Sequence, residues 1–299
     1  MIDGVSLLIR HSDDIQRIER NKNLHFVARR GYRSAIYKGL EIKLRANSCW
    51  INGSLHKFKN EGEHNADDFT YSDLKKTLAN LCNEIGITRD FAEIKNIEIG
   101  VNIILPYDPI YFIDSIIKRK TYYPEFTSVG SRFNYSQYAI KIYSKSKQDK
   151  RYKDDNILRL EIRFEKMIEA RKRVGKIEFL SDLLEPSFWF YSGRCLNSLL
   201  NDIDIIDINK LISEKIPAMD MVEVLAWRYR DRWERCSTSR QRMKEKVYKI
   251  LEAHSLTDIK KNVQKMIGCK VNELLVHPKI QEYIQRVEAT REKMLHISI

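Results

Sequence analysis

Polar and hydrophobic residues alternate in short segments over about the first 170 residues, and this period of two is typical of half-buried strands. Leu40, Ile42 and Leu44, for example, alternate with charged residues. A short polar turn separates this segment from the next, so the two are expected to form a hairpin. The predicted strands are 5–9, 40–45, 51–58, 97–105, 137–143 and 158–164.

A different spacing, with aliphatic residues three or four positions apart, predicts a helix over 72–85. Thr70 followed by Asp73 is a capping signal at its start, and Gly86 is expected to end it. A second helix is predicted over 109–117, because Pro109 is favoured in a first helical turn.

After residue 175 the pattern becomes helical throughout. We therefore expect an α+β fold, with an antiparallel sheet in a first domain, 1–175, and an all-helical domain, 176–299. The predicted helices are 196–200, 206–214, 219–253, 256–267 and 278–295, with breaks at Pro186 and Pro217.

Three of the predicted strands, 97–105, 137–143 and 158–164, each have one aliphatic face and one polar face. If these strands share one antiparallel sheet, their polar faces lie together. The residues on that face are Glu98, Asn102, Lys141, Tyr143, Arg159, Glu161 and Arg163.

These residue types suit a specific chemistry. Carboxylates can hold a divalent cation, arginines can clamp phosphate, and a tyrosine can act as a nucleophile. The same pattern fits a solvated sheet face with cross-strand ion pairs, and periodicity alone leaves both interpretations open. The segment 141–153 supports the first, because it carries six basic residues and one acid around Tyr143. Such a loop can neutralise phosphates and lower the pKa of a phenol.

Composition narrows the class of protein. The 53 Lys and Arg against 41 Asp and Glu give a net charge of +12, which favours a polyanionic partner. With 43% hydrophobic residues, the chain is expected to fold, which excludes disorder, a coiled coil and a collagen-like repeat. We expect no membrane span and no secretory signal. Five cysteines without a CxxC pair argue against a zinc site and for a reducing cytoplasm.

Positive charge is also concentrated in 228–249, which has nine basic residues and three acids. A helix here would bury Trp233 and expose its basic residues, which would contact DNA phosphates in a salt-dependent way. A solvated helix surface explains the same charges. The exposed basic residues are expected to include Arg228, Arg232, Arg235, Arg240 and Arg242.

The order of these motifs resembles that of the replication initiators of rolling-circle plasmids and filamentous phages. The resemblance covers about residues 1–170, starts with the opening 2–5, and implies that the sheet is of ferredoxin or RRM type. Segment 51–58, followed by Asn65 and 68–74, is similar to a phage-initiator motif, and 97–102 to the acidic strand of the family. Segments 136–145 and 158–162 resemble the tyrosine strand and the R-x-E strand of the plasmid initiators.

In that family a tyrosine attacks a backbone phosphate of one origin strand, and a divalent cation polarises that phosphate. The resemblance implies that Tyr143 is the nucleophile and that Lys145 or Lys147 stabilises its phenolate or the phosphate. The implied ligands of Mg²⁺ or Mn²⁺ are Glu98 and Glu161, with Asn102 as a weaker candidate. The implied DNA contacts in this region are Lys141, Lys150, Arg151, Arg159 and Arg163.

The chain departs from the wider superfamily in one respect. Many rolling-circle nucleases bind metal through a His-x-His pair, and the seven histidines contain none. His56 is a candidate ligand, although a surface position is the stronger expectation. Tyr138 is the rival nucleophile but is expected in the core, and Tyr135 and Tyr152 also stay open as nucleophiles.

The expected function is strand-specific nicking and joining of DNA to start rolling-circle replication of a phage or small plasmid in a bacterial cytoplasm. Its expected partners are origin DNA, a host helicase and polymerase, and a second copy in a homodimer. A plasmid mobilisation relaxase and a non-enzymatic DNA-binding regulator are the alternatives.

Overall fold

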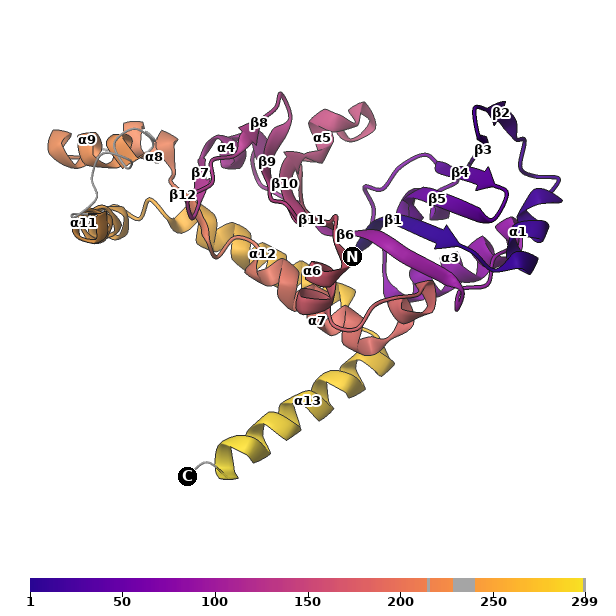
Figure 1. Cartoon of the computed structure of the whole chain (residues 1–299). Coiled ribbons are helices and arrows are strands. Elements are labelled where there is room, and N and C mark those ends of the chain that lie inside the picture. Colours follow the sequence, from indigo (N-terminus) through magenta and orange to yellow (C-terminus); the bar gives the residue numbers. More distant parts are fainter. Residues whose placement is uncertain (214–215, 228–239, 298–299) are drawn as a thin grey trace.

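The computed structural model describes residues 1–213, 216–227 and 240–297, and its largest element is a ten-stranded antiparallel sheet (Figure 1). The strand order is β2-β3-β4-β5-β1-β6-β11-β10-β9-β8. This arrangement confirms the α+β class, with a sheet larger than a ferredoxin-type unit. The strands are β1 (Ile2–Ile9), β2 (Val27–Arg29), β3 (Tyr32–Tyr37), β4 (Leu40–Arg45), β5 (Ser48–Ser54), β6 (Ala92–Ile104), β7 (Ile116–Arg119), β8 (Glu125–Phe126), β9 (Gly130–Asn134), β10 (Tyr138–Ser144), β11 (Ile157–Phe164) and β12 (Ile203–Ile205).

Helices follow the sheet in the second half of the chain and also connect its strands. The helices are α1 (Ser12–Glu19), α2 (Leu55–Lys59), α3 (Tyr71–Leu81), α4 (Pro109–Asp114), α5 (Lys145–Gln148), α6 (Met167–Val174), α7 (Pro186–Ser198), α8 (Ile208–Ser213), α9 (Ala218–Trp227), α11 (Arg240–Ala253), α12 (Asp258–Leu274) and α13 (Pro278–Ile297), with short helical turns η1 (Cys82–Gly86), η2 (Lys150–Tyr152) and η3 (Leu180–Leu184).

The aliphatic face of the central strands is covered by helices. Ile99 on β6 and Leu160 on β11 are fully buried, and α6, α7 and α12 pack against β6 (Figure 1). Each such side chain stabilises the fold by about 1.5–3 kcal/mol. Because these helices and the sheet share one hydrophobic core, the opposite, polar face is the one left for a functional site. The division into domains at residue 175 stays a prediction.

A second, smaller hydrophobic cluster holds α8, α9 and α11 together at the end of the molecule far from β2 and β3 (Figure 1). Its largest side chain is Trp227, which is buried with Lys118 above its ring. None of the helices in the described ranges is long and apolar enough to cross a membrane.

Several predicted elements are confirmed. Helix α3 begins after a capping box in which Thr70 Oγ1 accepts from the backbone of Asp73 and the Asp73 side chain accepts from the backbone of Thr70. Strands β4 and β5 form the predicted hairpin, and β10 and β11 agree with their predicted segments to within one residue. Strand β6 contains most of its predicted segment but begins at Ala92 rather than at residue 97.

Other boundaries differ from prediction. The strand predicted over 51–58 ends at Ser54, because the Ser54 hydroxyl accepts from the backbone of Lys57 and starts α2. The helix predicted over 109–117 ends at Asp114, and the following residues form β7. Strand β7 pairs with β12, so the region after 175 contains a short strand as well as helices. The pattern also missed α1, β2, β3 and α6, and the helix predicted over 196–200 is the end of α7.

Candidate active site

The strand register brings the predicted polar side chains into direct cross-strand positions. On β6 and β11, Glu98 pairs with Arg163, and Asn102 pairs with Arg159. On β10 and β11, Lys141 pairs with Glu161 and Tyr143 pairs with Arg159. The polar faces predicted from the alternating pattern therefore form one continuous surface.

Three carboxylates converge on this surface, and we call them the carboxylate cluster. They are Asp3 on β1, Glu98 on β6 and Glu161 on β11, and oxygens from all three lie within 4.8 Å of one another. Sequence reasoning found Glu98 and Glu161 but missed Asp3. An acidic residue within an otherwise apolar strand could have marked Asp3 as a candidate. The residues that lie beside Asp3 depend on the strand order, however, and periodicity does not reveal that order.

Arg159 contacts two of the three carboxylates of this cluster. Its guanidinium lies 2.6 Å from Asp3 Oδ2, donates to Glu161 Oε2 at 2.8 Å and donates to Asn102 Oδ1 at 2.9 Å. The side chain is only 3% exposed. Arg159 therefore does not lie where it was expected to hold DNA phosphate, because burial and three polar partners direct it into the protein.

Lys141 lies between two of the carboxylates. Its ammonium donates to Glu161 Oε1 at 2.6 Å and to Glu98 Oε1 at 3.2 Å. Burial and the charge of Glu161 raise the pKa of Glu98 above its ordinary value. Burial would also raise the pKa of Glu161, but Arg159 and Lys141 outweigh it and hold that pKa below its ordinary value.

The cluster fits a hard divalent cation. Mg²⁺ and Mn²⁺ prefer oxygen ligands, and three carboxylates from three rigid strands supply them. The ammonium of Lys141 already lies where positive charge is favoured, between Glu98 and Glu161. The side chain of Asn102, the third predicted ligand, is engaged by other partners. Its amide nitrogen donates to the carbonyls of Asn65 and Ala66, and its oxygen accepts from Arg159.

Tyr143 borders the carboxylate cluster. Its hydroxyl donates to Glu161 Oε2 at 3.2 Å. Burial raises the pKa of the Tyr143 phenol well above its ordinary value. The expectation that the basic segment 141–153 lowers this pKa is wrong, because burial of the phenol outweighs the nearby positive charge. The hydroxyl is therefore protonated at neutral pH and needs an acceptor for its proton.

Two glycines make room for these side chains. A Cβ at Gly130, directly opposite Tyr143 on β9, would lie 2.3 Å from the Tyr143 Cβ. A Cβ at Gly100, opposite Glu161 on β6, would lie 2.9 Å from the Glu161 Cβ. Any larger residue at either position would displace the nucleophile candidate or the carboxylate.

The basic residues after Tyr143 point in different directions. Lys145 is buried, donates to Gln148 and has its pKa lowered to about 8 by burial and by the charge of Arg159. Lys147 forms an ion pair with Asp108 at 2.9 Å, away from the cluster. Lys150 and Arg151 are exposed, and Arg151 pairs with Asp149. Of the two predicted catalytic lysines, Lys145 lies within electrostatic reach of Asp3.

His56 is buried rather than on the surface. Its Nε2 lies 2.6 Å from Asp67 Oδ1, and its ring stacks on Phe69 at 4.9 Å. Burial lowers the pKa of His56 to about 4 despite the nearby Asp67. The surface prediction was wrong because His56 belongs to α2, whose buried side packs on β1.

The rival tyrosines lie elsewhere. Tyr135 and Tyr138 stack on each other, and both hydroxyls accept hydrogen bonds from Arg119. Tyr152, which lies in η2, makes an edge-to-face ring contact with His64. Among the described residues, Tyr143 is the tyrosine whose hydroxyl contacts the carboxylate cluster.

The basic residues predicted near the C-terminus are only partly covered by the structure. Arg228, Arg232 and Arg235 lie outside the described residues, and only the backbone of Arg240 is described. Arg242 is exposed on α11, at the end of the molecule that holds the second hydrophobic cluster (Figure 1).

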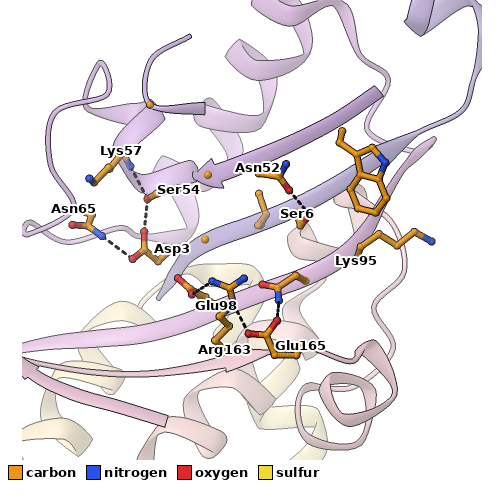
Figure 2. Close-up of a pocket in the computed structure, with 16 residues that line it drawn as sticks. Asp3, Ser6, Asn52, Ser54, Lys57, Asn65, Lys95, Glu98, Arg163 and Glu165 are labelled. Carbon is orange, nitrogen blue, oxygen red and sulfur yellow. Dashed lines mark hydrogen bonds and ion pairs between the residues drawn. The ribbon is translucent and has the colours of Figure 1, made fainter. Parts of the chain in front are cut away.

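A polar pocket of about 650 Å³ adjoins the cluster on the side away from Tyr143, over β5, β1 and β6. Figure 2 shows Asp3 and Glu98 at the pocket, with Ser6 further along β1 and Asn52 on the neighbouring strand β5. Asp3 is held there by Ser54, Asn65 and Arg159.

Comparison with known proteins gives one structural likeness. No family model and no curated protein matches the chain. The chain is similar to a solved structure of a rolling circle replication initiator protein from Geobacillus stearothermophilus, with a TM-score of 0.40 and 13% sequence identity. The match covers 69% of this chain and 86% of that chain. The function of this chain rests on the residues of its own site.

Proposed function

We propose that this protein is a replication initiator that nicks and rejoins one DNA strand at an origin. The observation that carries the proposal is the hydrogen bond from Tyr143 to Glu161, within a cluster of three carboxylates. A tyrosine that attacks a phosphodiester needs an acceptor for its proton and positive charge near the phosphate. Glu161 supplies the first, and Lys141 and Arg163 supply part of the second.

The two oxygens of Glu161 have different partners. Oε1 accepts from Lys141, whereas Oε2 accepts from both Tyr143 and Arg159. In the nicking step the Tyr143 oxygen forms a bond to phosphorus, the bond from phosphorus to the 3′ oxygen breaks, and the phenol proton passes to Glu161 Oε2. The released 3′ oxygen takes a proton from a solvent water, and the hydroxide that is left takes the phenol proton from Glu161, which restores the carboxylate. The products are a 5′-phosphotyrosyl link and a free 3′-hydroxyl, and reversal of the step joins the ends.

Asp3, Glu98 and Glu161 would hold a divalent cation, Mg²⁺ or Mn²⁺. When bound, the cation polarises the scissile phosphate. Arg159 holds the carboxylates in place, since it pairs with both Asp3 and Glu161. Arg163 is 41% exposed at its side chain and lies beside Glu98, so it is available to a DNA phosphate.

The proposed setting is a phage or small plasmid that replicates by a rolling circle in a bacterial cytoplasm. The free 3′-hydroxyl would prime synthesis by a host polymerase, and a host helicase would open the duplex. The exposed basic residues Lys150, Arg151 and Arg242 support contact with DNA.

The test is covalent capture. The protein is incubated with a labelled single-stranded library, or with its own replicon, in Mg²⁺ or Mn²⁺, and analysed on a denaturing gel and by peptide mass spectrometry. We expect a DNA-linked peptide that contains Tyr143. Tyr143→Phe should abolish the adduct and keep DNA binding, whereas the matched control Tyr138→Phe should still form it.

An adduct of undiminished yield in Tyr143→Phe would exclude this nucleophile. No adduct in either metal, with salt-sensitive DNA binding intact, would instead favour the non-enzymatic regulator.

A further inference from the structure

The pocket beside the carboxylate cluster has a floor of small polar side chains. Ser6 on β1 pairs in register with Asn52 on β5 and with Asn96 on β6, so the three form one row across the sheet. All three line the pocket, and Figure 2 shows Ser6 and Asn52 joined by a hydrogen bond. Trp50 lies two residues before Asn52 on the same face of β5 and lines the pocket as well.

Several of these groups have unused bonding capacity. The Asn52 oxygen accepts from Ser6, and the Asn96 nitrogen donates to Glu165. Within the described ranges the Asn52 nitrogen, the Asn96 oxygen and the indole of Trp50 have no hydrogen-bond or ring partner. A flat ring beside an amide donor and an amide acceptor suits a nucleobase, which offers a stacking face and polar edges.

Cations surround this floor. Lys57 and Arg163 line the pocket near the carboxylate cluster, and Lys95 lines it further along β6. Lys57 has no ion-pair partner among the described residues. Arg163 is paired with Glu98 and Glu165, and Lys95 with Glu93. The carboxylates of Asp3, Glu98 and Glu165 line the pocket as well, so a negatively charged backbone that enters it would depend chiefly on Lys57.

The direction of the DNA follows from the chemistry of nicking. In phosphoryl transfer the attacking and leaving oxygens lie roughly in line on opposite sides of phosphorus. Tyr143 attacks from β10, and the strand order continues through β11 and β6 to β1 and β5. The leaving 3′ oxygen therefore points away from β10, toward the pocket.

We infer that this pocket binds the first nucleotides on the 5′ side of the nick, those that keep the new 3′-hydroxyl, and that Trp50 stacks on one of their bases. The inference rests on the proposed function, because the in-line direction requires Tyr143 as the nucleophile. Beyond the nicking step itself, the inference specifies which side of the nick lies in the pocket and which side chain contacts a base.

The test is site-specific photo-crosslinking. Adduct formation by the unmodified protein first locates the nick in a single-stranded DNA. Tyr143→Phe is then irradiated with oligonucleotides that carry 5-iododeoxyuridine at the first, second or third position on either side of the nick. We expect the crosslinked peptide that contains Trp50 to come from probes on the 5′ side.

The outcomes separate the two proposals. If the Tyr143 adduct forms but the Trp50 peptide is crosslinked only from the 3′ side, or from neither side, the pocket assignment is overturned and the nicking function stands. If no adduct forms, both proposals fail.

Substitution of the ring gives a second measurement. Trp50→Ala should weaken binding of a single-stranded oligonucleotide that ends in the 3′-hydroxyl at the nick by about tenfold, since base stacking on an aromatic side chain contributes that order of affinity. Trp50→Phe should restore most of the loss. Phe91→Ala, at a 47% exposed ring outside the pocket, is the matched control and should bind like the parent protein. Equal binding by Trp50→Ala and the parent would overturn the stacking role.

Discussion

The carboxylate cluster and the adjoining pocket lie on the same face of the same sheet, yet they differ in how their polar groups are satisfied. In the cluster the charges are buried and paired with one another, as for Arg159 with Asp3 and Glu161. In the pocket the amides of Asn52 and Asn96 each keep a donor or acceptor that bonds to none of the described residues. The comparison indicates that the cluster is a closed network whose side chains hold one another in place, whereas the pocket is an open surface whose polar groups are only partly satisfied.

The largest expected effect tests whether the cluster is a closed network. Arg159→Met should lower the free energy of unfolding by about 3–5 kcal/mol, because it leaves buried carboxylates without their partner. Arg163→Met, on the same face of the same strand but 41% exposed, should lower it by about 1 kcal/mol or less. Denaturant unfolding of both variants measures the difference. Equal losses would contradict the distinction between the two arginines.

The next effect concerns the pH dependence of stability near the cluster. Because burial lowers the pKa of His56 from 6.5 to about 4, the unfolded chain takes up this proton first as the pH falls. Stability is therefore complete above about pH 6.5 and declines toward pH 4, by about 3 kcal/mol in total. Urea unfolding at intervals between pH 4 and 7 should show a shallower slope for His56→Gln than for the parent. An unchanged slope would exclude His56 as its source.

A smaller effect concerns the cation preference of the cluster. The ammonium of Lys141 lies between Glu98 and Glu161, so a divalent cation must displace it. We expect Lys141→Met to bind Mn²⁺ about tenfold more tightly, which corresponds to about 1.4 kcal/mol. Electron paramagnetic resonance at pH 8 measures free Mn²⁺ directly. Lys95→Met, whose lysine pairs with Glu93 outside the cluster, should bind Mn²⁺ like the parent. Weaker Mn²⁺ binding by Lys141→Met would show that the lysine supports the site instead.

The smallest effect concerns the pocket and its cation Lys57. Lys57→Ala should weaken binding of single-stranded DNA only a few-fold and reduce the salt dependence by about one phosphate contact. Stability should stay within about 0.5 kcal/mol of the parent, since Lys57 has no ion-pair partner among the described residues. Fluorescence anisotropy at several salt concentrations provides the measurement. An unchanged salt slope would place the DNA backbone away from Lys57.

Alternation along single strands was enough to predict part of the candidate site. It placed Glu98, Glu161 and Tyr143 on one polar surface, because side-chain direction in a strand is a local property. It did not predict Asp3, because the position of β1 beside β6 is set by packing of the whole sheet. Likewise, a sequence cannot reveal that Arg159 is buried while Arg163 is exposed, since both lie on the same face of β11.

The secondary structure was likewise predictable where it depends on local pattern and not where it depends on packing between distant segments. Regular elements with clear periodicity, such as α3 and β10, were predictable, whereas short segments such as β7 and β12 were not. β7 and β12 pair with each other across more than 80 residues, so neither forms by local preference. His56 was misplaced because a capping serine, Ser54, converted the end of a predicted strand into α2.

Gly130 has a consequence for how the protein tolerates mutation. It has no side chain and takes part in no proposed chemical step, yet a single added carbon there would collide with Tyr143. A library of all single substitutions, scored by replication, should therefore show position 130 to be as intolerant as position 143. In such a data set this glycine would be grouped with the residues of the proposed nicking step, although its contribution is only the space that it leaves empty.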